Sequence, residues 1–365
     1  MKSIILVSII SCSVQIFTDL NKKMIVTSCV ADLRYQPKAN DSELKLPTSD
    51  QTNPLQITQL LLGEHVIAYE EFVDENNKLW LKVNAPQQQF YHIPDAWHGY
   101  PGWIQAKDAI EVEKFPKCNI VINQYTADIF DENNQTICTL SIGTRLNGTK
   151  INNDLWSITL PSGQKVFIKN CDVYFMSPIV QESIEDLRKS IVETSLKFLG
   201  NFYSWGGRSA QNDRYISSVD CSALVGLSFL AHGLQLPRMS HEQFLNSTKL
   251  NFCSDLQAGD LIFFVSITKH FTRMDHVMLY LGNNQFNGEN TDGKIIEATF
   301  AQNHVVRTVS FQDRMGTECH RIASGDIVDD HGYKFYVYFA SFLNDPAMIQ
   351  TLRDNALNHE YRQTT

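Results

Sequence analysis

One cysteine of the chain stands where its thiol could react. The stretch VDCSALVGLSFL places Cys221 directly before an apolar run that ends at Gly233. Asp220 and Ser222, which flank the cysteine, are residue types that cap the first turn of helices. The pattern predicts a buried helix with Cys221 at its N-terminal end, where free backbone N–H groups and the helix dipole favour a thiolate. A cysteine that serves only for packing is the alternative, and both readings are open at this point.

A reactive thiol needs a base, and His276 is the candidate. It lies in RMDHVMLYLG, whose alternation predicts a strand with His276, Met278 and Tyr280 on one face. The chain between Cys221 and His276 is long enough to bring that strand back to the N-terminal end of the predicted helix. A strand histidine that only packs in the core is the alternative.

Two all-β segments precede these residues. Residues 22–110 and 111–178 both contain short alternating runs separated by turn residues, which predicts small barrels. They repeat a weak pattern: the first contains ADLRYQP, LLLGEHV and KLWLKV, and the second contains ADIFDEN, LSIGTRL and DLWSITL. Any other small all-β fold is the alternative.

The pattern changes after these segments. Apolar residues from Ile184 to Leu199 fall at helical spacing, and strand-like runs such as DLIFFVSI and KIIEATF follow the Cys221 helix. A helix first and strands later predict an α+β domain over residues 180–345. Residues 346–365 then form a C-terminal tail.

Composition excludes several classes of function. The chain has 365 residues, a formal net charge of −9 and 43% hydrophobic residues. It has no basic run, phosphate loop or GxGxxG, so we expect no nucleic-acid partner. The eight cysteines form no CxxC pair, which argues against structural zinc. Their even number permits disulfides, although a chain of this size does not need them.

The N-terminus predicts export. In MKSIILVSIISCSVQIFTD, Lys2 precedes an uncharged run that extends to Asp19, as in a secretory signal over residues 1–21. The sequence IISC also resembles a lipobox that ends at Cys12. We therefore expect a cell-envelope or periplasmic location, with a buried first strand and a cytoplasmic location as the alternative. The run is too short and polar for a membrane span, and we expect no integral span elsewhere.

Several motifs in order resemble one family. FYSWGGRSA, VDCSALVGLSF, GLQLPRMSHEQ, LQAGDLIFF and DHVMLYLG resemble the NlpC-type cysteine peptidases, papain-like amidases of the bacterial cell wall, over residues 185–345. The two preceding segments resemble bacterial SH3-like domains, and the combination is similar to γ-D-glutamyl-L-diamino acid endopeptidases. The resemblance implies an α+β papain-like domain, with helices packed on an antiparallel sheet, preceded by two small all-β SH3-like barrels. It implies no cofactor and no metal.

The resemblance also implies catalytic roles. Cys221 is the nucleophile and His276 the general base. The third residue of such sites is a polar group on the next strand, commonly a histidine, and Glu297 in GKIIEATF falls at that place. His304 is a rival because the insertion NGENTDGK separates the two strands. A solvent-facing Glu297 on an edge strand is a further alternative.

The peptidase domain carries the first set of implied substrate residues. These enzymes bind stem peptides with a free N-terminal L-Ala, and Asp220 would pair with that ammonium or would only cap the helix. Ser222 and Ser240 match family serines that bind the peptide, although Ser240 could equally cap a helix. Tyr203 would line the cleft beside the oxyanion, and the backbone N–H of Cys221 would donate to it.

The first SH3-like domain contributes the second set. Tyr100 in HGYPGWI matches a family tyrosine that closes the amine pocket, with ordinary barrel core as the alternative. Glu70 or Glu71 in YEEF adds an acidic group to that pocket. A further departure from the family is Ala223, where glycine is commonest.

The predicted function is therefore a cysteine endopeptidase that cuts the γ-D-Glu–diaminopimelate bond of peptidoglycan stem peptides or murein fragments. An acyltransferase or amidase on the same fold is one alternative, and an inactive cell-wall-binding protein is another. A metal hydrolase is disfavoured, because SHEQF lacks the second histidine of an HExxH motif.

Overall fold

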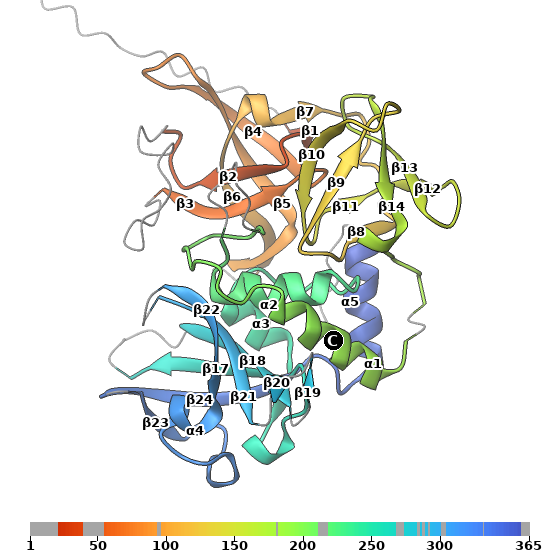
Figure 1. Cartoon of the computed structure of the whole chain (residues 1–365). Coiled ribbons are helices and arrows are strands. Elements are labelled where there is room, and N and C mark those ends of the chain that lie inside the picture. The colour runs from red at the N-terminus through yellow and green to blue at the C-terminus, as the bar shows by residue number, and fades with distance from the viewer. Residues whose placement is uncertain are drawn as a thin grey trace, which may run out of the picture.

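The computed structural model shows two β units lying on an α+β domain (Figure 1). The described residues are 21–38, 55–92, 96–179, 182–210, 218–267, 274–282, 285–286, 289–290, 293–300, 304–330 and 332–358. The predicted signal segment, residues 1–21, lies outside them except for its last residue. In the described part of the chain, no helix has the length and apolar character needed to cross a membrane.

The first β unit is one antiparallel sheet with the order β3-β2-β6-β5-β4-β1-β7. Its strands are β1 (Lys22–Val26), β2 (Val30–Arg34), β3 (Gln56–Leu61), β4 (His65–Val73), β5 (Leu79–His92), β6 (Ala96–Gln105) and β7 (Ala109–Glu111). A 3-10 turn, Ala106–Asp108, precedes β7. Trp80 is fully buried, and its indole N–H donates to Asp74 at 3.0 Å, which ties the β4–β5 turn to the core.

The second β unit contains a five-stranded and a three-stranded sheet. Its strands are β8 (Ile120–Ile122), β9 (Thr126–Phe130), β10 (Thr136–Ser141), β11 (Arg145–Leu146), β12 (Gly148–Lys150), β13 (Leu155–Thr159), β14 (Lys165–Lys169) and β15 (Val173–Phe175). A 3-10 turn, Asn170–Asp172, precedes the last strand as in the first unit.

The weak sequence repeat corresponds to a repeated turn. Gly63 and Gly143 both have left-handed backbone, with φ of 82° and 83°, where residues with a Cβ are strained. The Gly63 N–H donates to the Val26 carbonyl, and the Gly143 N–H donates to the Ile122 carbonyl. The described ladders form open sheets, so closure into SH3-like barrels stays a prediction.

The third part is the predicted α+β domain, which the structure confirms as helices packed on an antiparallel sheet. The sheet order is β16-β24-β17-β18-β21-β22, with β23 paired to β24. Its strands are β16 (Thr248–Leu250), β17 (Leu261–Ser266), β18 (His276–Gly282), β21 (Lys294–Thr299), β22 (Val305–Ser310), β23 (Ile327–Asp330) and β24 (Tyr333–Ser341). A two-stranded pair, β19 (Gln285–Phe286) and β20 (Glu289–Asn290), follows β18.

Both faces of this sheet are covered. The helices of the domain are α1 (Ile184–Leu196), α2 (Cys221–Leu230), α3 (Ser240–Asn246), α4 (Phe311–Met315) and α5 (Pro346–Asn358). Because side chains alternate along each strand, Leu261 and Phe263 pack with α1 and α2, whereas Ile262 and Phe264 pack with α4.

The C-terminal segment, residues 346–365, is predicted as a tail but contains the helix α5. Ile349 and Leu352 of this helix belong to the main core, and the Arg353 guanidinium donates to the Tyr174 hydroxyl of the second β unit at 3.0 Å. α5 therefore packs against the rest of the molecule (Figure 1).

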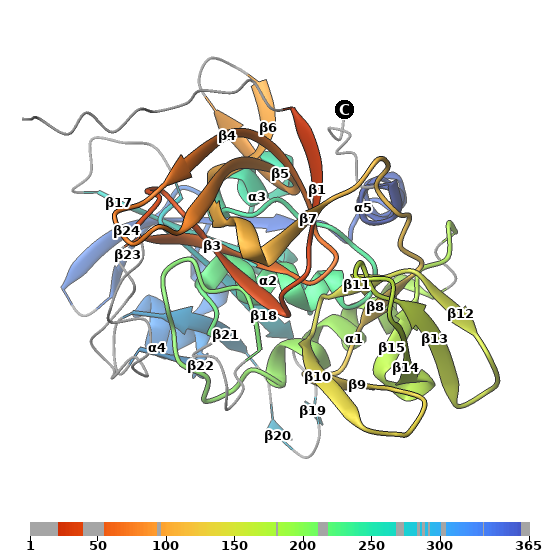
Figure 2. The ribbon, with the colours of Figure 1, turned by 90° about the horizontal axis from the view of Figure 1, so that it is seen from above.

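The helix α2 lies at the junction of all three parts. Nine of its ten residues are buried, which explains why its sequence is apolar all round. Leu61 of the first β unit and Ile142 of the second belong to the same core cluster as α2. A Cβ at Gly143 would lie 2.6 Å from Leu227 of α2, so the turn of the second unit sits directly on the helix. Figure 2 shows the two β units side by side over α2.

A buried ionic cluster also joins the three parts. Glu64 of the first β unit lies 2.9 Å from Arg208 of the α+β domain and 3.8 Å from Arg145 of the second unit. Arg145 donates further to the Gln235 side chain and to the Ala356 carbonyl. Burial raises the pKa of Glu64, but the two guanidiniums outweigh it and hold that pKa below its usual range. The carboxylate therefore stays ionised at the junction.

One disulfide is present among the described residues, where the sequence only permitted such bonds. Cys253 and Cys319 are bonded, with their Cα atoms 5.3 Å apart. They lie in the short 3-10 turns Cys253–Asp255 and Cys319–Arg321. The bond ties the segment that follows α4 to the segment that follows β16.

Candidate active site

Cys221 is the first residue of α2, as the sequence predicts. Asp220 is the N-cap, with extended backbone, and its carboxylate accepts a hydrogen bond from the Ala223 N–H at 2.8 Å. Cys221 is a free thiol and is 8% exposed. The thiol therefore lies where the backbone N–H groups and the dipole of a helix stabilise a negative charge.

Asp220 does more than cap the helix. Its two carboxylate oxygens accept five hydrogen bonds, from the Ala223 and Gly206 N–H groups, the Ser222 hydroxyl and both terminal nitrogens of Arg238. The Arg238–Asp220 pair is buried, at 2.7 Å for its shorter contact. These protein donors occupy both oxygens, so the carboxylate fixes the start of α2 against the loop that carries Arg238.

The turn before Cys221 needs its two glycines. Gly206 has φ of 74°, and a Cβ there would lie 2.8 Å from the Ile57 backbone of β3. A Cβ at Gly207 would lie 2.5 Å from the carbonyl oxygen of Ser218. The Asp220 N–H donates to the Gly207 carbonyl at 3.0 Å, which holds the segment leading into Cys221. The WGG motif thus allows the first β unit and the Cys221 segment to approach closely.

His276 touches both other members of the predicted triad. It is the first residue of β18, its Nε2 lies 2.8 Å from Glu297 Oε2, and it lies close enough to Cys221 for the two side chains to interact electrostatically. Burial lowers the pKa of His276, but the interactions with Cys221 and Glu297 outweigh it and raise the pKa to about 9. The imidazole is therefore protonated at neutral pH when it is paired with a thiolate.

Glu297 lies in the core and not at a solvent-facing edge. Its side chain is 0% exposed and lies on β21, between β18 and β22. Besides His276 it binds two arginines: Arg307 donates to Oε1 at 2.7 and 3.0 Å, and Arg314 donates to Oε2 at 3.1 Å. Burial raises the pKa of Glu297, but these three partners outweigh it and hold the pKa well below its usual range.

The rival third residue, His304, lies elsewhere. Its backbone is left-handed, with φ of 52°, and its carbonyl accepts a hydrogen bond from the Tyr203 N–H at 2.7 Å. Its ring packs on Phe300 with the centroids 4.0 Å apart. The structure thus brings Cys221, His276 and Glu297 together and gives His304 a place beside Tyr203.

Tyr203 lies close enough to Cys221 for the two to interact electrostatically. Burial, followed by the nearby Cys221 and Asp220, raises the pKa of its phenol. The hydroxyl therefore keeps its proton at neutral pH and remains a hydrogen-bond donor. This is the property that the predicted oxyanion role requires.

The two predicted serine contacts are both buried. The Ser222 hydroxyl lies between Asp220 (3.1 Å) and Arg238 (3.0 Å). The Ser240 hydroxyl donates to the Met274 carbonyl at 2.9 Å, just before β18. The N-cap of α3 is Met239, so the alternative of Ser240 as a helix cap is wrong. Both hydroxyls hold loops around the triad, and their contact with substrate stays a prediction.

The predicted contributions of the first β unit are Tyr100 and either Glu70 or Glu71. The Tyr100 hydroxyl donates to the Met239 sulfur at 3.5 Å, and its ring belongs to the core of that unit. Glu70 forms an ion pair with Lys82 at 3.0 Å, and Glu71 lies opposite Leu81 in the β4–β5 ladder. The described partners of both glutamates thus lie within the first β unit.

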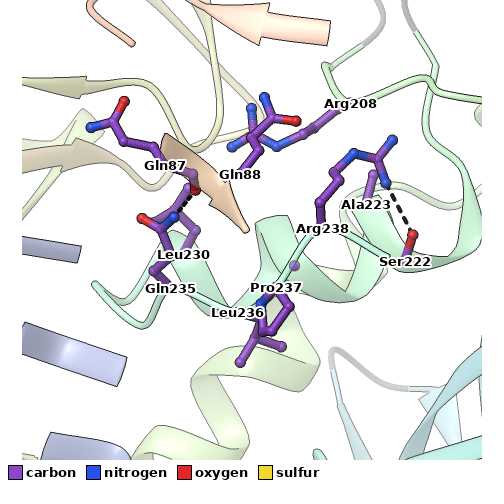
Figure 3. Close-up of a pocket in the computed structure, with 11 residues that line it drawn as sticks. Gln87, Gln88, Arg208, Ser222, Ala223, Leu230, Gln235, Leu236, Pro237 and Arg238 are labelled. Carbon is purple, nitrogen blue, oxygen red and sulfur yellow. Dashed lines mark hydrogen bonds between the residues drawn. The ribbon is translucent and has the colours of Figure 1, made fainter. Parts of the chain in front are cut away.

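A small cavity lies along α2, on the face that carries Ser222, Gly226 and Leu230 (Figure 3). Its volume is about 20 Å³, which suits one water molecule. It is lined by residues that include Gln88 of β5, Arg208, Ser222, Pro237 and Arg238. A cavity of this size cannot hold a peptide, so it belongs to the scaffold around Asp220.

Three arginines of the site received no role from sequence alone. Arg238 stands in the LPR motif, but only the structure shows that it pairs with Asp220. Arg307 lies directly opposite Glu297 in the β21–β22 ladder, so a hairpin register centred on residue 302 would have paired the two charges. Arg314 lies on a short helix after the hairpin, and no sequence pattern predicts its contact with Glu297.

The arrangement can perform nucleophilic catalysis. A thiol at a helix N-terminus, a histidine in contact with it and a carboxylate that orients the histidine form a Cys–His–Glu triad. Among the described residues, no three His, Cys, Asp or Glu side chains are placed to hold a metal ion. The helix-on-antiparallel-sheet fold with this triad defines a papain-like cysteine peptidase.

Comparison with known proteins identifies the class more closely. Residues 200–315 match the NlpC/P60 family. The chain is 28% identical over 258 residues to a γ-D-glutamyl-L-lysine dipeptidyl-peptidase of Bacillus cereus, covering 68% of each protein. It is 28% identical over 242 residues to the protein of the same description from Bacillus subtilis, covering 66% of this chain and 74% of the relative.

A solved structure supports the fold. An NlpC/P60 family protein from Bacillus cereus ATCC 10987 superposes with a TM-score of 0.62 at 24% identity, covering 79% of this chain and 94% of that one. Taken with the match over residues 200–315 and the peptidase relatives, the chain carries an NlpC/P60 domain and is a cysteine peptidase.

Proposed function

We propose that the protein hydrolyses the amide bond between γ-D-Glu and an L-diamino acid in peptidoglycan stem peptides. The observation that carries the proposal is the contact of His276 with both Cys221 and Glu297. The names of the relatives, γ-D-glutamyl-L-lysine dipeptidyl-peptidases, support this bond as the target. The diamino acid is either L-lysine, as in those names, or diaminopimelate, as the sequence resemblance implies.

The chemistry follows from the triad. The Cys221 thiolate attacks the γ-carbonyl carbon of D-Glu, and the tetrahedral oxyanion accepts hydrogen bonds from the Cys221 N–H and the Tyr203 hydroxyl. The imidazolium of His276 gives its proton to the amine of the diamino acid as the C–N bond breaks. His276 then takes a proton from water, and the hydroxide attacks the thioester to release the acyl product and the thiol. Glu297 keeps the imidazole oriented and stabilises its cation throughout.

A preference for a free N-terminal L-Ala is the finer part of the proposal. Tyr100 and Asp220 are its candidate contacts, as the resemblance implies. Five hydrogen bonds from the protein already satisfy Asp220, so an ammonium would have to add to a filled carboxylate. The peptide experiment below decides whether this preference exists.

The experiment compares four peptides with the full chain. The peptides are L-Ala-γ-D-Glu-L-Lys and L-Ala-γ-D-Glu-meso-diaminopimelate, each with a free or an acetylated N-terminus, and the products are identified by mass spectrometry. We expect release of L-Ala-D-Glu from the free peptides, and no product with Cys221→Ala. Equal cleavage of the acetylated peptides would refute the amine preference. No cleavage of any peptide by the folded enzyme would refute the proposed bond.

We also propose that the protein acts in the cell envelope and that its β units are SH3-like. The predicted signal over residues 1–21 and the Cys253–Cys319 disulfide support the location, because disulfides persist in oxidising compartments. The repeated turn at Gly63 and Gly143 supports a common fold for the two units. A fusion of residues 1–21 to a reporter that is active only outside the cytoplasm would test the location.

A further inference from the structure

The carboxylate of the triad has an unusual environment. Glu297 is fully buried, and a buried carboxylate is costly unless opposite charges and hydrogen bonds surround it. Arg307 meets it from β22 through Nε and Nη2, in a two-nitrogen contact with Oε1. Arg314 meets it from α4, on the other oxygen. The remaining partner of Glu297 is His276 of β18.

The charges of this cluster balance when the thiol is ionised. Arg314 is itself paired with Asp330 of β23, so the second arginine adds no unpaired charge. The cationic members are the His276 imidazolium, Arg307 and Arg314; the anionic members are the Cys221 thiolate, Glu297 and Asp330. Within these described contacts, the reactive ion pair thus forms beside equal numbers of positive and negative groups.

The geometry of the two oxygens gives the arginines a directional role. Arg307 occupies Oε1 completely, which leaves Oε2 for His276 and Arg314. A planar guanidinium that binds one carboxylate oxygen with two nitrogens restricts rotation of the carboxylate. Without this restraint, Glu297 could turn away from the imidazole.

We propose that Arg307 and Arg314 are positioning residues of the active site, which hold Glu297 ionised and directed at His276 so that the thiolate–imidazolium pair can form. The inference rests on the proposed catalytic role of the triad. It concerns the state of the thiol and is independent of which peptide is cut.

The test measures how the alkylation rate of Cys221 depends on pH. Iodoacetamide is added to the full chain from pH 4 to pH 9, and modification of the peptide that contains Cys221 is followed by mass spectrometry. In the wild type we expect reaction at pH 6–7 faster than that of a small free thiol. We expect the rate to fall at low pH, and the pH of this fall is the quantity compared between variants.

Arg307→Gln is the main variant, because Arg307 is 23% exposed and its loss is tolerated more easily than that of the 6% exposed Arg314. Loss of this positive charge makes the Glu297 carboxylate harder to form and so weakens its support of the His276 imidazolium. We expect the fall to move upward by about one pH unit, with a rate about tenfold lower on that limb. Arg307→Lys keeps the charge and should keep the pH of the fall, with a lower maximal rate.

Two controls separate positioning from structure and surface charge. Arg321→Gln makes the same charge change at an exposed side chain and should leave the profile unmoved. When Arg307→Gln is added to the Glu297→Gln variant, the pH of the fall should not shift further, because the side chain at position 297 that Arg307 contacts is already neutral. A profile that stays in place in Arg307→Gln while the melting temperature falls would overturn the proposal, as would equal shifts in Arg307→Gln and Arg321→Gln.

The outcome does not depend on the substrate. Alkylation needs no peptide, so a shifted profile in an enzyme that cuts none of the four peptides supports the positioning role and refutes only the proposed bond.

Discussion

Replacing Asp220 by Asn tests the buried pair that fixes the nucleophile. The change keeps the size of the side chain and a helix-capping oxygen, so the loss of the cap itself is small. It leaves Arg238, which is 4% exposed, with a charge and no anionic partner. Burial lowers the pKa of Arg238, and Asp220 outweighs burial to raise it, so the pair depends on this carboxylate. Breaking a buried ion pair on one side costs about 3–5 kcal/mol.

The assay is equilibrium unfolding in urea, followed by fluorescence, for the wild type, Asp220→Asn and the control Asp186→Asn. Asp186 is also a carboxylate near a helix N-terminus, but its contact with Ser183 is exposed. We expect a loss of about 3–5 kcal/mol for Asp220→Asn and less than about 0.5 kcal/mol for the control. A loss below about 1 kcal/mol for Asp220→Asn would refute the argument from the buried pair, and Asp220 would then be available as an amine anchor.

Three further predictions follow from the structure. The raised pKa of His276, about 9, means that pairing of the protonated imidazole stabilises the fold below pH 6.5, and that this contribution, about 3 kcal/mol, is lost as the pH rises through 9. Urea midpoints of the wild type and His276→Gln should therefore differ at pH 6 and converge at pH 10. A constant difference would contradict the raised pKa of His276. Replacing both Cys253 and Cys319 by Ala opens a loop of 66 residues and should cost about 4 kcal/mol in the chain-entropy account; an unchanged urea midpoint would show that the bond constrains nothing. Gly207→Ala places a Cβ 2.5 Å from the Ser218 carbonyl, so we expect slower alkylation of Cys221 at pH 7. Gly226→Ala, whose Cβ would make only an ordinary contact with the Gln243 side chain at 3.8 Å, serves as the control for thiol reactivity.

The sequence predicted those parts of the site that depend on local pattern. The apolar run after Asp-Cys-Ser predicted where α2 begins, and alternation around His276 predicted β18. Glu297 was placed through the resemblance, and the structure brings it to 2.8 Å from His276. These features were accessible because helix starts and strand alternation are encoded within a few residues.

The contacts between residues far apart in the sequence could not be predicted from local pattern. Asp220 reads in sequence as a cap or an anchor, and only the packing of the Arg238 loop shows that its oxygens are already filled. Ser240 is predicted from the sequence as a substrate contact or a helix cap, yet the helix starts at that residue and its hydroxyl donates to the Met274 carbonyl. Arg314 reaches Glu297 because α4 covers one face of the sheet, and nothing in the local sequence records that face.

The same packing explains why the two β units belong to the scaffold of this active site. The Gly206 turn approaches the Ile57 backbone, and the Arg208 N–H donates to Gln59 of β3 at 2.9 Å. On the other side of the junction, Glu64 binds Arg208 and lies near Arg145 of the second unit. Each contact buries a polar or charged group that would be left without its partner if the units separated, at a cost of several kcal/mol for a charged one. The segment that leads into the nucleophile is therefore held by the β units as well as by the helix that follows it.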